Sequence, residues 1–144
     1  MAHVTVLCVY VVSSWFTVPP SSQVLGVCED VGAAALVEGL SPALVIALAF
    51  TESRLNAGAR SSRGAVGPLQ VLPWFHCPGR RERGCDLVAA GVKSITRFQL
   101  RFGDGWLCHW NSGNECYRRS RLFARIVLGR AAELSRARGE RCRR

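Results

Sequence analysis

Residues 43–54, ALVIALAFTESR, form a run that is apolar on nearly every face of a helix. Ser41 before it is a good N-cap, and Pro42 suits the first helical position. Because a helix that is apolar all round must be buried, we expect this segment to be the central helix of the core. Glu52 stands at its C-terminal end, where the chain is about to emerge.

The rest of the chain predicts a small, mainly α-helical single domain. Its 144 residues suit one domain, and a hydrophobic fraction of 49% supports a real core and argues against disorder. Further helices are expected at about 29–38, at 87–102 and from 118 into the 130s. Residues 56–73 are rich in Gly, Ser and Arg and predict a short irregular or β-hairpin segment, and residues 106–113 predict a turn region.

Seven cysteines constrain the redox chemistry, at positions 8, 28, 77, 85, 108, 116 and 142. Cys77 and Cys85 flank one short polar loop, and residues 108 and 116 flank another, so we expect two local disulfides. Cys28 could then pair with Cys142, although six cysteines formally allow fifteen pairings. Zinc is the weaker interpretation, because no CxxC pair exists and the histidines are poorly spaced, so no metal is expected.

The first 26 residues resemble an export segment. An apolar stretch over residues 4–18 precedes Pro19 and Pro20, and the first charged residue is Glu29. We expect residues 1–26 to be a signal peptide or membrane anchor, with cleavage after Gly26, and residues 27–144 to form the exported domain. Removal of Cys8 would leave an even number of cysteines. No Lys or Arg precedes the apolar stretch, so an uncleaved anchor, a slowly released anchor or a wrongly assigned start stay open.

Positive charge is concentrated at the C-terminal end. Residues 118–144 hold ten Arg against Glu133 and Glu140, a net +8 of the chain's +9. A basic face attracts anionic partners such as nucleic acid, anionic lipid or acidic polymers, and the alternative is a solvated helix face with a basic tail. No helix-turn-helix, finger or aromatic-interleaved RNA motif is present, so nucleic acid is not the expected partner.

Glu52 is the first candidate for chemistry. Burying a carboxylate beside an apolar helix is costly unless it is paired or protonated, and such surroundings raise its pKa. A raised pKa is what a general acid needs near neutral pH. The ordinary alternative is an exposed Glu at a helix end.

The residues around Glu52 form an ordered series of short motifs. Glu52-Ser53 is followed by a Gly-Ala-x-Gly-x-x-Gln-x-x-Pro block over residues 64–73, which includes Gln70, and then by Leu87 and Gly91. A Trp-Asn-Ser-Gly turn follows at residues 110–113. This series resembles the lytic transglycosylase family, the soluble type related to goose-type lysozyme, over about residues 42–128. The resemblance implies a lysozyme-like fold and cleavage of the MurNAc–GlcNAc β-1,4 bond of peptidoglycan, with a 1,6-anhydromuramic product.

The resemblance also implies roles for individual residues. Glu52 would protonate the glycosidic oxygen and then act as base while the sugar's own C6 hydroxyl closes the anhydro ring. Ser53 would orient Glu52, Gln70 would line the sugar groove, and Trp110 and Asn111 would lie near the cleaved bond. No cofactor is implied, the partners are peptidoglycan strands and, through the basic helix, anionic envelope polymers, and a monomer is expected.

Three positions depart from the family pattern. Leu87 stands where the family has Asn, Trp110 where it has Tyr, and Phe123 where a late Tyr would fall. A hydrolytic muramidase and a non-catalytic wall-binding basic protein are therefore the alternatives. A phage lysis enzyme and a host wall-remodelling enzyme are equally compatible with the sequence.

Overall fold

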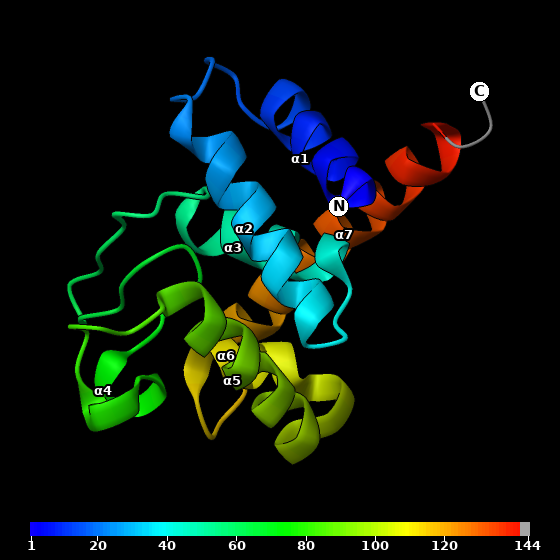
Figure 1. Cartoon of the computed structure of the whole chain (residues 1–144). Helices are drawn as coiled ribbons and strands as arrows, with labels where there is room; N and C mark the ends of the chain where they lie inside the picture. The colour runs from blue at the N-terminus through cyan, green and yellow to red at the C-terminus, as the bar shows by residue number, and fades with distance from the viewer. Residues whose placement is uncertain (142–144) are drawn as a thin grey trace.

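The computed structural model describes residues 1–141 and the side chains of residues 1–138. It confirms a mainly α-helical single domain (Figure 1). The helices are α1 (Ala2–Ser14), α2 (Gln23–Val37), α3 (Pro42–Ser53), α4 (Pro73–His76), η1 (Pro78–Arg80), α5 (Leu87–Phe102), η2 (Gly103–Gly105), α6 (Trp106–Ser112) and α7 (Arg118–Arg141).

Helix α3 is the buried central helix that its apolar sequence predicts. Residues 45–49 of α3 are fully buried, and the helix packs against α2 and α7. The Ser41 hydroxyl caps its start by accepting a hydrogen bond from the Leu44 amide at 3.4 Å. Arg54 ends it in the left-handed conformation, which turns the chain away directly after Glu52.

Helix α5 has the predicted limits. The Asp86 carboxylate accepts a hydrogen bond from the Ala89 amide at 3.0 Å, and Gly103, with φ of 60°, ends the helix. One face of α5 buries Val92 and Ile95 in the core.

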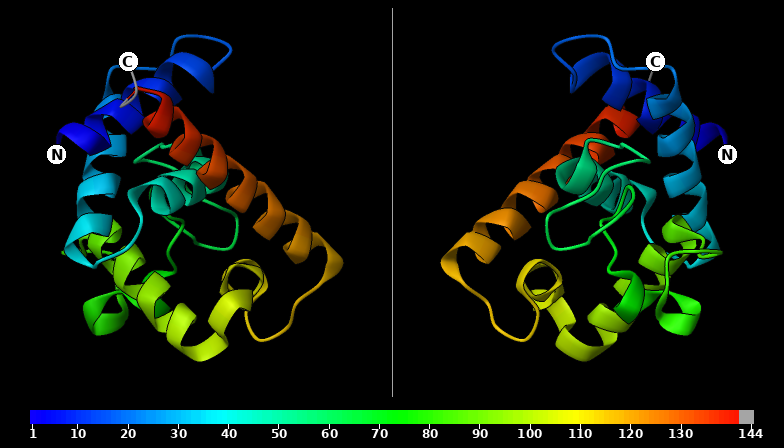
Figure 2. Two further views of the ribbon diagram at one scale, coloured as in Figure 1. Left: turned by 90° about the vertical axis from the view of Figure 1, so that its right-hand side faces the viewer. Right: turned by 90° about the vertical axis from the view of Figure 1, so that its left-hand side faces the viewer.

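Helix α1 is packed into the domain beside α2 and α7 (Figures 1 and 2). Its residues Val4, Leu7, Cys8 and Val11 are buried. No helix among residues 1–141 is both long and apolar enough to span a bilayer. Cleavage after Gly26 would cut α2 and remove α1, so the structure is that of the uncleaved chain. Export through residues 1–26 stays a prediction.

The structure corrects one predicted disulfide and confirms two. Cys28 is bonded to Cys8 and not to Cys142, because α1 and α2 lie side by side, and Cys142 lies outside the described residues. The local pairs form as predicted, one between residues 77 and 85 and one between residues 108 and 116.

Other boundaries also differ from the sequence prediction. Helix α2 starts at Gln23 instead of residue 29 and runs through Gly26. Residues 106–112 form the helix α6 instead of a turn. Trp106 and Leu107 are buried in the core, and their burial stabilises the helix. Residues 56–72 are irregular, with isolated bridges that join Arg60 to Val66 and Val66 to Val71.

The irregular segment is held against α5 by a close approach at Gly91. A Cβ atom there would lie 2.6 Å from Leu69 Cδ1 and 2.9 Å from Leu69 Cβ. We therefore expect Gly91→Ala to lower the free energy of unfolding by about 1–3 kcal/mol through overpacking. Gly129→Ala is the matched control, because no atom lies within 4 Å of a Cβ there and alanine favours a helix. Urea unfolding measures both; equal effects of the two substitutions would contradict this packing.

Candidate functional site

Glu52 lies in the last turn of α3 and is partly buried. Desolvation by the surrounding protein raises its pKa to about 7, while a hydrogen bond from the Trp110 side chain opposes part of that rise. The carboxyl group is therefore largely protonated at slightly acidic pH and can still lose its proton near neutrality. It combines access to solvent with the protonation behaviour of a general acid.

Trp110 is held by other aromatic rings. Its ring centroid lies 5.3 Å from that of Phe98, 6.2 Å from that of Trp106 and 6.0 Å from that of His76. These rings belong to α5, α6 and α4, so three helices fix the indole whose N–H reaches Glu52. The sequence interpretation gave Trp110 a role near the substrate and did not foresee its bond to the carboxyl group.

Ser53 joins the end of α3 to the irregular segment. Its hydroxyl lies 3.0 Å from the Ala49 carbonyl and 2.7 Å from the Pro68 carbonyl, both of which accept from it. The hydroxyl thus fixes the segment against the helix that carries Glu52. Its predicted role in orienting the Glu52 side chain stays a prediction.

Gln70 closes the irregular segment through its amide nitrogen. Nε2 donates to the Ala59 carbonyl at 3.2 Å and to the Gly67 carbonyl at 3.0 Å. Because these bonds occupy both amide hydrogens, the side chain can offer a ligand only its oxygen, as an acceptor. Gln70 can therefore accept a hydrogen bond from a sugar N–H or O–H group, but it cannot donate one to the sugar.

Backbone strain surrounds Glu52 and Gln70. Arg54, Leu55 and Gln70 all have positive φ, of 55°, 61° and 51°. Each costs a side-chain-bearing residue about 1–2 kcal/mol, so the surrounding contacts must enforce it. The side chain of Leu55, fully buried, supplies one such anchor. Arg80 is the fourth such residue among residues 1–141 and lies elsewhere, in η1.

Asn111 is exposed and lies beside Trp110 on α6. It lines a depression of about 430 Å³ between the irregular segment and the start of α7. Phe123 lines the same depression, so the two positions meet there although the sequence separates them. Arg63 and Arg119 add positive charge to it. Arg119 belongs to the basic segment that the sequence analysis identified, whereas nothing in the sequence around Arg63 marked it.

The departure at Leu87 has a structural counterpart. A Cβ atom on Gly67 would lie 3.0 Å from Leu87 Cδ1, so this leucine packs directly against a glycine of the irregular segment. Asp86 supplies the helix cap that an Asn at position 87 could have given. The loss of that polar residue therefore leaves both the cap and the packing in place.

Several other carboxylates are engaged elsewhere. Glu82 pairs with Arg60, Asp86 caps α5, and Glu133 accepts hydrogen bonds from Trp15 at 2.7 Å and from Tyr10 at 3.1 Å. Among residues 1–141, no three His, Cys, Asp or Glu side chains are grouped so as to hold a metal ion.

The raised pKa of Glu52 predicts a pH-dependent stability. The folded pKa of about 7 exceeds the ordinary 4.5, so stability falls as pH rises through that window and the buried charge develops. We expect Glu52→Gln to be more stable than the wild type above pH 7, by up to about 3 kcal/mol at 1.36 kcal/mol per pKa unit, with little difference at pH 4.

Urea unfolding of both proteins at pH 4 and pH 8 measures this difference. Asp104→Asn, on the exposed η2 turn, is the matched control and should change stability little at either pH. A Glu52→Gln effect that is the same at both pH values would contradict the raised pKa.

Comparisons of the chain with protein-family models, with curated proteins and with solved structures found no match.

Proposed function

We propose that this protein cleaves the glycan strands of bacterial peptidoglycan as a lytic transglycosylase, with Glu52 as its only acid/base. The observation that carries the proposal is the Glu52 carboxyl group itself. It lies at the end of a buried helix, burial raises its pKa to about 7, and Trp110 bonds to it. The motif series around it supports the choice of substrate.

The reaction follows from a single carboxyl group. Protonated Glu52 gives its proton to the oxygen that links MurNAc C1 to GlcNAc, and the C1–O bond breaks. The resulting carboxylate takes the proton from the C6 hydroxyl of the same MurNAc. At the same time the C6 oxygen forms a bond to C1. Glu52 is then protonated again, and the product carries a 1,6-anhydro ring. A pKa near 7 suits both halves of the cycle.

The engagement of other acids supports this scheme over one with two carboxylates. Glycosidases of the usual type need a second Asp or Glu facing the first across the cleaved bond. Asp86 and Glu133 are held in structural hydrogen bonds on α5 and at the α1–α7 contact. The substrate's own hydroxyl is therefore the proposed nucleophile.

The setting we propose is the periplasm or the extracellular side of a bacterial envelope. Three disulfides fit an oxidising, exported environment. We further propose that the arginines of α7 attract anionic envelope polymers, which would concentrate the enzyme on its substrate.

Product analysis tests the proposed reaction. Purified peptidoglycan is digested with the wild type, Glu52→Gln and Asp104→Asn, and the products are identified by mass spectrometry. We expect anhydromuramic ends from the wild type and from Asp104→Asn, and a loss of at least about a hundredfold in rate for Glu52→Gln, the usual size of a general acid–base contribution.

Two results would contradict the proposal. Reducing ends in place of anhydro ends would make the protein a muramidase that uses water. If Glu52→Gln cleared cell-wall suspensions as fast as the wild type, Glu52 would have no catalytic role and the protein would be a wall-binding basic protein.

Salt tests the attraction to the envelope. Because the screening length shrinks from about 10 Å at 0.1 M to about 3 Å at 1 M salt, we expect activity on whole cells to fall steeply over that range. Activity on short, soluble glycan fragments is the control and should fall much less than activity on cells. Equal activity on cells at low and high salt would exclude a role for the basic helix.

A further inference from the structure

A depression of about 460 Å³ lies between α4, α5 and the connection from α6 to α7. We call it the α4–α5 pocket. Its lining includes three phenylalanines, two arginines and one histidine, which are Phe75, Phe98, Phe102, Arg97, Arg101 and His76. The lining residues include no Asp or Glu, so its charge is uniformly positive.

The positive charge of the pocket follows one face of α5. Lys93, Arg97 and Arg101 are four residues apart and exposed, so they recur about every 6 Å along the helix. Arg101 is held in place, because it donates to the Asn114 side chain at 3.2 Å and lies 5.0 Å from the centre of the Phe102 ring. Lys93 and Asp86 both line an adjoining depression, which shares Arg97 and His76 with the α4–α5 pocket.

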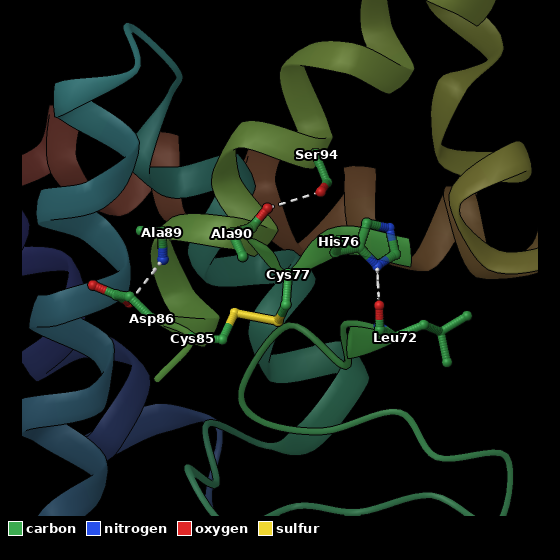
Figure 3. Close-up of a disulfide and its surroundings, with 8 residues drawn as sticks. All are labelled: Leu72, His76, Cys77, Cys85, Asp86, Ala89, Ala90 and Ser94. Carbon is green, nitrogen blue, oxygen red and sulfur yellow. Dashed lines mark hydrogen bonds between the residues drawn. A yellow bond between two sulfur atoms is a disulfide. The ribbon is translucent and has the colours of Figure 1, made fainter. Parts of the chain in front are cut away.

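His76 brings a polar atom without a partner to the same place. Its Nδ1 meets the Leu72 backbone, 3.0 Å from the amide and 3.2 Å from the carbonyl. Its Nε2 is buried and has no hydrogen-bond partner among the described residues. Figure 3 shows this second nitrogen turned away from Leu72. A buried polar atom left unbonded is costly, and this one belongs to a residue that lines the pocket.

The α4–α5 pocket lies one side chain from the candidate acid. Trp110 bonds to Glu52, and its ring also lies 5.3 Å from Phe98 and 6.0 Å from His76, both of which line the pocket. Trp110 thus contacts both the candidate acid and two side chains of the pocket wall.

We propose that the α4–α5 pocket binds the anionic peptide stem of peptidoglycan, so that the enzyme prefers strands that carry stems over bare glycan. This inference rests on the proposed function. Carboxylates of the stem would pair with Arg97 and Arg101, and its aliphatic parts would lie on the phenylalanine rings.

The experiment compares kcat/KM on two soluble substrates, glycan strands with intact stems and the same strands stripped by an amidase. We expect the wild type to favour the stem-bearing strands about fivefold, the size expected of two partly exposed charge pairs. Arg97→Gln with Arg101→Gln should remove that preference and leave the rate on bare strands unchanged. Arg97→Gln alone is the second variant, since it leaves the Arg101 bond to Asn114 intact, and should halve the preference.

Arg136→Gln with Arg138→Gln is the matched control. It removes the same charge from exposed positions on the distant half of α7 (Figure 1) and should keep the preference. A wild type that cleaves both substrates equally would overturn the inference. The inference would also be overturned if the control pair abolished the preference as fully as the Arg97/Arg101 pair does, because the preference would then depend on net charge alone.

Binding separates this inference from the proposed function. Calorimetry with the tripeptide L-Ala-γ-D-Glu-diaminopimelate uses the intact protein and needs no turnover. Binding that the Arg97/Arg101 pair loses and Glu52→Gln keeps would support the pocket even if neither strand were cleaved. Absence of binding by the wild type would overturn the pocket, while loss of cleavage in Glu52→Gln would still support the enzyme.

Discussion

The hydrogen bond between Trp110 and Glu52 is the contact around which the site is arranged. It joins the end of the buried helix α3 to α6, and thus joins two parts of the chain that the sequence sets far apart. Burial raises the pKa of the carboxyl group, the bond from Trp110 opposes part of that rise, and the resulting pKa of about 7 allows ionisation near neutrality. Any shift of either helix would change both the burial and the bond.

The other side of α3 is held by α7 and α1. Arg130 donates to the Thr51 hydroxyl at 2.9 Å and lies 4.8 Å from the centre of the Phe50 ring, on which Arg54 also packs at 5.0 Å. The Trp15 ring meets the same phenylalanine at 4.9 Å and bonds to α7 through Glu133. Phe50 and Thr51, the two residues before Glu52, are thus held by contacts from α7 and from Trp15 at the end of α1.

Local signals in the sequence predicted what depends on local chemistry. The caps at Ser41 and Asp86, the apolar run of α3 and two disulfides across short loops need only neighbouring residues. The disulfide of Cys8 and the packing of α1 depend on which helices meet, and that information is spread over the whole chain. Helix α6 was missed because it is short and ends in Gly113, so turn chemistry dominated its pattern. For Glu52, the sequence predicted the helix end and the raised pKa, but not the bond from Trp110.

The most direct measurement of the central claim is the pKa of Glu52 itself. Protein labelled with ¹³C at the glutamate side-chain carboxyl carbon is titrated by NMR, and Glu52→Gln identifies the Glu52 signal. We expect a midpoint near 7 in the wild type, set by burial and the opposing Trp110 bond, and a higher midpoint in Trp110→Phe, which lacks the donor. A wild-type midpoint near the ordinary 4.5, unmoved by Trp110→Phe, would contradict this expectation.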